Sequence, residues 1–222
     1  SATSAAEPGF ASAAVKSAAD KSLAAGALSA ASFADGSKSS LSADAGSGGA
    51  SAVTVGAMAT GASATSMLTL SAANGGLQVG STTGTGFVNG DVRAVASGSV
   101  LSTNGAQGGA GSVADITLSA QGGSITAGTV QVLASGMASD ARIAVQANAG
   151  SVQLNGPAMV EARGTDSKAS LSASGHSSDH TAAVQLTSLA QSASGSGAHA
   201  SSELTVRGGA LSVSGGVELQ AA

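Results

Sequence analysis

Large apolar residues alternate with small or polar ones along residues 114–156, in short runs separated by glycine-containing turns. Ile116 and Leu118 open one run, and Gln121-Gly122-Gly123 follows as a turn. Ile143 begins the same pattern a second time. Alternation at a period of two over short runs, punctuated by glycine, is typical of β-strands rather than helices. A strand-and-turn unit that recurs in this way predicts a β-solenoid in which each unit forms one coil.

Two sets of large apolar residues extend this pattern along the chain at the positions where strands are expected to open. In both sets the members recur roughly every 27 residues. Each coil is expected to bury its large side chains against those of its neighbours, so each set predicts one column of the core. The sequence therefore predicts an all-β parallel solenoid of about eight coils, about 40 Å long at the usual strand spacing. The first set is Val15, Leu41, Leu68, Val92, Ile116, Ile143, Leu171 and Leu204, and the second is Leu28, Val53, Leu77, Val100, Ile125, Val152, Val184 and Leu211.

Two regions fit the repeat less well. Residues 1–40 are rich in Ala and Ser, and the segment following Pro8 fits an alanine-rich helix, because Ala is the best helix former. The same segment also fits a first coil, which we favour because Val15 and Leu28 keep the spacing. Residues 41–222 form the predicted solenoid, with loop insertions expected at residues 175–181 and 192–200, which are rich in Ser, Gly and His.

Composition narrows the classes of partner. The chain has 222 residues with 12 acidic and 8 basic side chains, a net charge of −4, no Cys, Trp or Tyr, and 3 Phe. So few charges favour an ordered thin rod over a solvated disordered chain, with a silk-like tract as the alternative. Sugar clefts and single-stranded nucleic-acid sites depend on aromatic stacking, which this chain lacks, and its scattered cations form no phosphate-binding stripe. No apolar run is long enough to span a membrane. We therefore expect neither a nucleic-acid partner nor a transmembrane segment.

The candidate catalytic and metal-binding motifs have simpler interpretations as loops. His176 and His180 lie four residues apart, and His199 is the remaining histidine. That spacing presents one face to a metal on a helix but not in a Gly/Ser loop. Neither Gly84-Thr85-Gly86 nor Gly195-Ser196-Gly197 continues into a nucleotide-binding loop, and no nucleophile elbow occurs. The sequence thus predicts no enzyme activity, no catalytic residue, no metal site and no cofactor.

Three amides occupy equivalent predicted turns, at Asn74, Gln121 and Asn148. Stacked amides can form a hydrogen-bonded ladder between coils. Turn propensity alone also explains Asn in these places. We expect mainly turn propensity, with a partial ladder.

The segments DITLSAQGGSITAG and ARIAVQANAGSVQLNG resemble the repeats of filamentous haemagglutinin-type adhesins, and the resemblance covers roughly residues 65–222. It implies a right-handed parallel β-helix exported to the surface of Gram-negative bacteria. The secretion domain of that family, with its Asn-Pro motifs, is not visible in this sequence. No functional residue of the family maps onto the chain.

These observations predict a non-catalytic structural rod, a subunit or segment of an extracellular surface filament or adhesin. No helix, proline or charge cluster accompanies Val217-Glu218-Leu219 to cap a last coil, so we expect either a second copy stacked head to tail or the rest of a longer solenoid as partner. One alternative is an ice- or surface-binding solenoid, for which Thr82-Thr83 and Thr85 form only a local cluster. Another is a passenger that displays the loops near residues 175–200 to a host receptor.

Overall fold

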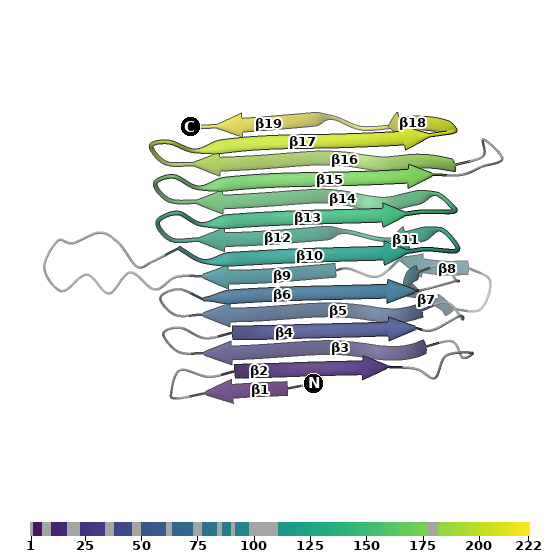
Figure 1. Ribbon diagram of the computed structural model, residues 1–222, viewed down its shortest axis with the longest axis horizontal. Helices are drawn as coiled ribbons and strands as arrows, with labels where there is room; N and C mark the ends of the chain where they lie inside the picture. Colours follow the sequence, from purple (N-terminus) through teal and green to yellow (C-terminus); the bar gives the residue numbers. More distant parts are fainter. Residues whose placement is uncertain are drawn as a thin grey trace, which may run out of the picture.

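The computed structural model of the protein is an all-β solenoid, as the alternation predicts (Figure 1). The structure describes residues 2–5, 10–16, 23–33, 38–45, 50–60, 64–72, 77–83, 86–89, 92–97, 111–176 and 182–222, and no helix occurs within these ranges. Strands of successive coils pair in parallel, while β7 and β8 form an antiparallel hairpin. The predicted fold class is confirmed.

Two sheets make up the solenoid, and each coil contributes strands to both. The seven-stranded sheet contains β2 (Phe10–Lys16), β4 (Lys38–Ala45), β6 (Thr65–Ala72), β10 (Val113–Ala120), β13 (Asp140–Ala147), β15 (Lys168–His176) and β17 (His199–Arg207). The twelve-stranded sheet contains β1 (Ala2–Ala5), β3 (Leu23–Phe33), β5 (Ala50–Thr60), β7 (Leu77–Thr83), β8 (Gly86–Asn89), β9 (Val92–Ser97), β11 (Ile125–Ala127), β12 (Val130–Ser135), β14 (Val152–Arg163), β16 (Ala182–Ser194), β18 (Gly209–Val213) and β19 (Val217–Ala221).

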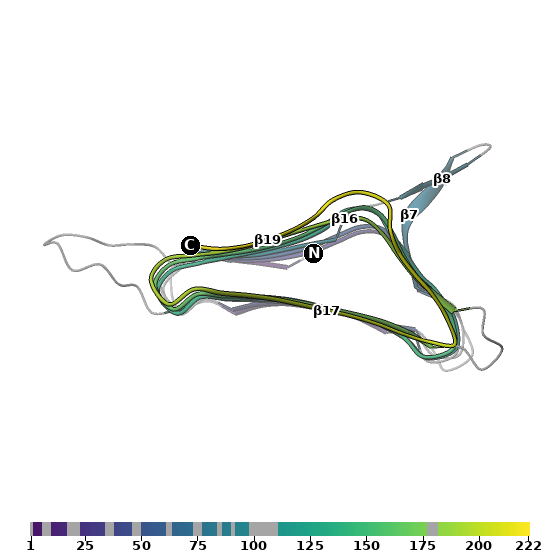
Figure 2. The same ribbon diagram turned by 90° about the horizontal axis from the view of Figure 1, so that it is seen from above.

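Figure 2 views the solenoid along the stack and shows the coils superposed as a triangle with two long sides and one short side. The seven-stranded sheet forms one long side. The twelve-stranded sheet bends and forms the other two: a short arm, with β7, β11 and β18, and a long arm, with β1, β9, β12 and β19. The long strands β3, β5, β14 and β16 pass from the short arm into the long arm.

The core lies inside the triangle, because every second residue of a strand points inward. In β13 the buried residues are Ala141, Ile143, Val145 and Ala147, and the residues between them are intermediate or exposed. The neighbouring strands β10 and β15 keep the same register, so buried residues stack on buried residues from coil to coil. Each coil therefore relies on the coils above and below it for a core.

The solenoid has fewer coils than the eight expected, because the coil predicted to open at Val92 does not exist as a separate coil. The spacing of apolar residues predicts Val92 in the same column as Leu68 and Ile116. In the structure β6 pairs directly with β10, with no strand between them. Val92 instead lies in the long arm, where it pairs with Val55 of β5 and Val130 of β12. The chain between β6 and β10 is thus a single coil enlarged by the β7–β8 hairpin.

The two less regular regions of the sequence also lie within strands where the structure describes them. In residues 1–40, β1, β2 and β3 pair with the coil above rather than forming a helix. Around residues 175–200, β15 runs to His176, β16 runs to Ser194 and β17 begins at His199. The second expected insertion, residues 192–200, is therefore mostly strand, with a turn of ordinary length between β16 and β17. Residues 177–181 lie outside the described part of the chain.

Glycines in the turns that lead back to the seven-stranded sheet allow the coils to approach one another. Gly136, Gly164 and Gly195 occupy equivalent places, with φ of 131°, 129° and 117°. A Cβ added at Gly164 would lie far inside van der Waals contact of the Gly136 carbonyl oxygen, and one at Gly195 would meet the Gly164 carbonyl in the same way. Only glycine fits both the backbone conformation and the spacing.

Candidate functional site

The first predicted column holds over most of the seven-stranded sheet. Register pairs connect Leu41 to Leu68, Leu68 to Ile116, Ile116 to Ile143 and Ile143 to Leu171, and all five are at most 2% exposed. Leu204 does not continue this column. Its partner in β15 is Ala173, and Ser202 takes the place above Leu171.

The second predicted column is the short arm. Leu77, Ile125, Val152, Val184 and Leu211 are successive register partners. Leu28 lies in the long arm, where it pairs with Val55, and Ala50 rather than Val53 is the partner of Leu77. Val100 lies outside the described residues.

The exceptions at Val92 and Leu28 share one cause. Both sheets present inward β-branched or aliphatic residues at alternate positions, so the residue type does not say which side of the triangle a strand occupies. Where turn lengths vary, as after Leu68, a side chain at the correct spacing can belong to the wrong side. Val15 and Leu204 lie on the predicted side but two residues away from the predicted column, because Val15 pairs with Ala43 and Leu204 with Ala173.

In the last coil, three large apolar side chains that belong to core columns are about half exposed. Leu211, Val217 and Leu219 are 50%, 52% and 49% exposed. Their register partners in β16 are Val184, Leu189 and Gln191, which are at most 2% exposed. The difference arises because no further coil covers β18 and β19 in the described chain. Together with the free edge of β17, these two strands form the surface we call the end row (residues 199–207, 209–213 and 217–221), seen at the top of Figure 1.

The end row has two chemical properties. Its outer edge presents backbone N–H and C=O groups that no described strand pairs, which is a template for another parallel strand. Its half-exposed Leu211 and Val217 side chains continue columns that are apolar below, and Leu219 lies above Gln191. A strand added to this edge would form backbone hydrogen bonds and would also cover the half-exposed apolar side chains. Both interactions already occur between successive coils of the solenoid.

Polar groups enter the core just below the end row. Gln191 is 2% exposed and continues the column of Val160, in the position below Leu219. Its Nε2 donates to the Ser201 carbonyl oxygen at 2.6 Å, and its Oε1 accepts from the Ser202 hydroxyl. The buried amide is thus satisfied across the triangle, between β16 and β17.

A column of buried serines lies at the start of the seven-stranded sheet and was missed by the sequence analysis. Ser112, Ser139 and Ser167 are 0% exposed. Each hydroxyl donates to a backbone carbonyl of the next coil: Ser139 to Arg163 O at 2.9 Å and Ser167 to Ser194 O at 3.0 Å. These bonds tie one turn to the next. Serine is so common in this sequence that only its place after the turn glycine could have identified the column.

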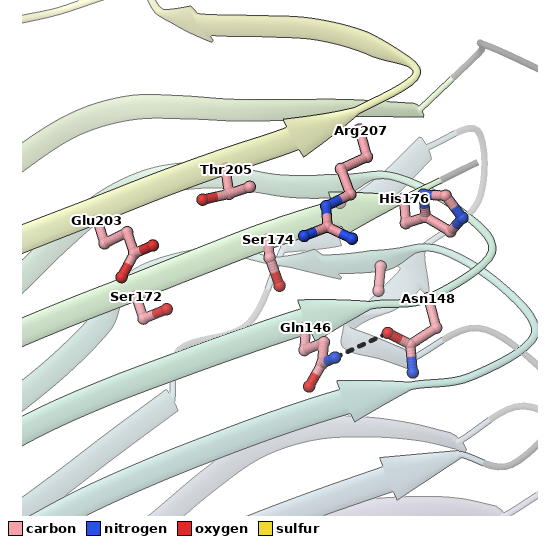
Figure 3. Close-up of a pocket in the computed structure, with 10 residues that line it drawn as sticks. Gln146, Asn148, Ser172, Ser174, His176, Glu203, Thr205 and Arg207 are labelled. Atoms are coloured by element: carbon pink, nitrogen blue, oxygen red, sulfur yellow. Dashed lines mark hydrogen bonds between the residues drawn. The ribbon is translucent and has the colours of Figure 1, made fainter. Parts of the chain in front are cut away.

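The outer surface of the seven-stranded sheet is polar and carries a shallow hollow of about 470 Å³ (Figure 3). The hollow crosses β13, β15 and β17 and is lined by Gln146, Asn148, Ser172, Ser174, His176, Glu203, Thr205 and Arg207, with Ala147 and Gly175 beneath. Figure 3 shows the Arg207 side chain turned back across β15, between Ser174 and His176. Gln146 Nε2 donates to Asn148 Oδ1 at 2.8 Å, which leaves the Asn148 Nδ2 hydrogens for another acceptor.

Arg207 differs from Arg142 and Arg163 in its ion pairing. Arg142 binds Asp140, and Arg163 Nε lies 2.5 Å from Glu161 Oε1; in both pairs the acid stands two residues earlier on the same strand. Thr205 stands at that place before Arg207. Within the part of the chain that the structure describes, Arg207 has no ion-pair partner, so it leaves a positive charge at one end of the hollow.

Asp115 lies on β10, where it is the register partner of Arg142 on β13. Burial raises the pKa of its carboxyl above the ordinary 3.8, and the Asp140 carboxylate adds to that rise. The Thr117 hydroxyl, at 3.2 Å, and the Arg142 guanidinium oppose it. Asp140 in turn raises the pKa of Arg142. No group of three metal-ligating side chains surrounds these residues or any other place in the described ranges.

The histidines and turn motifs lie apart. His176 ends β15 and His199 begins β17, at opposite ends of parallel strands, and His180 falls outside the described residues. Gly195-Ser196-Gly197 is the turn before β17, with φ of 117° and 77° at its glycines. The described residues contain no helix that is long and apolar enough to cross a membrane.

The predicted amide ladder takes a different form. Asn148 bonds to Gln146 of its own strand rather than to another coil, and Asn74 lies outside the described residues. An amide bond between coils occurs instead in the short arm, where Gln153 Nε2 donates to Gln185 Oε1 at 3.1 Å. Asn148 is therefore not part of a side-chain amide ladder, and the amide bond between coils joins strands β14 and β16 rather than turns.

Comparison of the chain with protein-family models, with curated proteins and with solved structures found no match.

Proposed function

We propose that this chain is a non-catalytic structural protein, a subunit or segment of an extracellular filament or adhesin at a bacterial cell surface, in which β-solenoids stack end to end. The observation that carries the proposal is the end row. Three of its apolar side chains are about half exposed at register positions that are buried one coil below.

Two further features support a structural role. The described residues bring together no metal-ligating cluster, and the buried side chains of Ser167 and Gln191 donate to backbone carbonyl oxygens of other strands. The resemblance of residues 65–222 to filamentous haemagglutinin-type repeats agrees with a place at the cell surface. A rod whose strands pair along its axis resists separation cooperatively, because each coil completes the core of the next.

The test is the state of assembly of the purified chain. Sedimentation velocity and electron microscopy over a range of concentrations should detect rods longer than one chain. Leu211→Asp places a charge in the end row and should abolish them, because burying an unpaired carboxylate between coils is costly. Met137→Asp is the matched control: Met137 is 43% exposed, but it lies in a turn on the side of the rod. Equal assembly of both variants, or a wild-type chain that stays single at high concentration, would refute the proposal.

The hollow around Arg207 favours a second candidate function, the display of a ligand-binding face on the side of the rod. Arg207, His176 and Asn148 offer hydrogen-bond donors at one end, and a carboxylate-bearing ligand suits an uncompensated guanidinium. Citrate and polyglutamate are simple probes for isothermal titration. Arg207→Gln should weaken their binding about tenfold or more, whereas Arg142→Gln, on the same face but paired with Asp140, should change it little. Equal losses in both variants would indicate general charge attraction only.

A further inference from the structure

The three sides of the triangle do not contain the same number of strands. The seven-stranded sheet runs from β2 to β17, and the short arm likewise runs through seven strands, from the first half of β3 to β18. The long arm has one more within the described residues, because β1 lies below β3 at one end and β19 lies above β16 at the other. Figure 1 shows β1 alone beneath β2 and β3.

This extra strand prevents two copies from stacking flush. If β2 of a second copy lies directly above β17, then β3 of that copy begins directly above β18. Its β1 must then occupy the height already taken by β19. If instead β1 lies above β19, one strand is missing from the other two sides, and the apolar columns there stay open. End-to-end stacking of this chain therefore requires one of the two strands to leave its place.

The register indicates which strand leaves. β1 pairs with β3 through four residues, from Ala2 with Ala30 to Ala5 with Phe33. β19 pairs with β16 through five, from Leu189 with Val217 to Ala193 with Ala221. The described register of β1 and β3 starts at Ala2 and Ala30, so none of its pairs includes Leu28, two residues before Ala30.

β19 offers β3 the longer and more apolar partner. Leu28 and Leu189 are equivalent positions, because each belongs to the series that runs through Val55, Val92, Val130 and Ala158. In the stacked arrangement Val217 would therefore pair with Leu28, and Leu219 with Ala30. Val217 would pair with Leu28, which is not in the described register of β1 and β3, and Leu219 would replace Ala2.

The same arrangement matches the other half-exposed side chain of the end row. The short-arm column that ends in Leu211 begins in β3 at Leu23, which pairs with Ala50. Flush stacking thus places Leu23 of one copy above Leu211 of the other. All three half-exposed side chains of the end row meet small or large apolar residues in register.

We propose, on the basis of the stacking function above, that a second copy of this chain docks on the end row by strand exchange, with β19 of one copy displacing β1 of the next. The partner is the β2–β3 end of an identical chain. In the single chain β1 covers part of β3, and β1 must detach before another copy can be added to the rod. The contact is heterologous and repeats without closing, so it builds a filament.

A reversible cross-link tests the exchange in the full-length chain. Thr3 and Ala31 are register partners of β1 and β3, so Thr3→Cys together with Ala31→Cys allows a disulfide that holds β1 in place. The oxidised variant should remain single in sedimentation velocity at concentrations where the wild type assembles, and reductant should restore assembly. Free-thiol titration verifies the state of the cross-link.

A variant lacking residues 1–9 provides the converse measurement. Without β1 the three sides have equal numbers of strands, so no detachment precedes docking. The concentration for half-assembly should fall about tenfold or more, because the competent state is then fully populated. Equal assembly of oxidised and reduced double-cysteine chains, or no gain from the deletion, would overturn strand exchange while leaving stacking intact. Failure of the wild type, the reduced chain and the deletion variant to assemble would overturn both.

Discussion

The middle coils and the last coil are built from the same repeat but differ in how their inward side chains are covered. Ile143, in the middle of its column, is 2% exposed, whereas Leu211 at the end of its column is 50% exposed. Both are large apolar residues on parallel strands in register with the coil below. What differs is the coil above. Burial in this protein is therefore a property of the stack and not of any one coil.

The polar core groups follow the same division. Near the open end, Gln191 of β16 and Ser202 of β17 occupy positions that hold Val160 and Leu171 one coil earlier. These two columns thus change from apolar to polar close to the open end. A core that admits a bonded amide gives up some apolar burial, but its hydrogen bonds accept only one register. The comparison shows that the middle columns are apolar, whereas hydrogen bonds from Gln191 join β16 to β17 near the open end.

The largest expected effect comes from removing a side chain in the middle of a column. Ile143→Ala leaves a cavity between Ile116 and Leu171 and should lower the free energy of unfolding by about 3 kcal/mol. Leu211→Ala, at the end, should lower it by less than about 1 kcal/mol, because half of that side chain is already in water. Urea denaturation of dilute, unassembled protein measures both. Similar losses would mean that the last coil is covered in solution.

A smaller loss is expected from a turn between middle coils. Gly164→Ala forces a Cβ against the Gly136 carbonyl and a side chain into a φ of 129°, so we expect a loss of about 2 kcal/mol. Gly216→Ala is the control in the last coil, where an added Cβ has no atom within 4 Å. Its unfolding free energy should stay within about 0.5 kcal/mol of the wild type. Thermal unfolding by circular dichroism would reveal whether the two turns differ as expected.

Replacing two buried serines by alanine should change the unfolding free energy in opposite directions. Ser167→Ala removes a bond to Ser194 O and should cost about 1 kcal/mol. Ser66 is equally buried, but its hydroxyl has no hydrogen-bond partner, and the equivalent residue of the next coil is Ala114. Ser66→Ala should therefore raise the unfolding free energy, by up to about 1 kcal/mol. A loss in both variants would show that the Ser66 hydroxyl is satisfied in solution.

The smallest effect concerns the outer surface of a middle coil. Because burial raises the pKa of Asp115, the folded chain favours the protonated carboxyl more than the unfolded chain does. The associated stability is complete below the unfolded value near 3.8 and disappears as the pH rises through the folded value. Asp115→Asn removes this dependence, so its unfolding free energy relative to that of the wild type should rise between pH 3 and pH 7. Unfolding curves at both pH values measure the difference; a relative loss at pH 7 would contradict it.

Much of the fold follows from local sequence pattern. Period-two alternation identified strands at Ile116 and Ile143, and the recurrence near 27 residues identified the column that joins them to Leu171. The pattern failed at Val92 and Leu204, where a residue of the right type and spacing belongs to another side or another column. The features of the candidate site were less visible. Nothing near Arg207 in the sequence distinguishes it from Arg142 except the residue two places before it, and its hollow exists only because three coils place their outer side chains together.

By itself, the sequence determined that this chain forms parallel strands in repeated coils, because alternation and spacing are properties of neighbouring residues and of the small volume that Ala, Ser and Gly leave for a core. The tertiary structure alone decided which side of the triangle each strand occupies, how many coils there are, and which apolar residues stay uncovered. Those outcomes depend on the lengths of the turns and on contacts between residues a full coil apart, which the spacing of side-chain types does not encode.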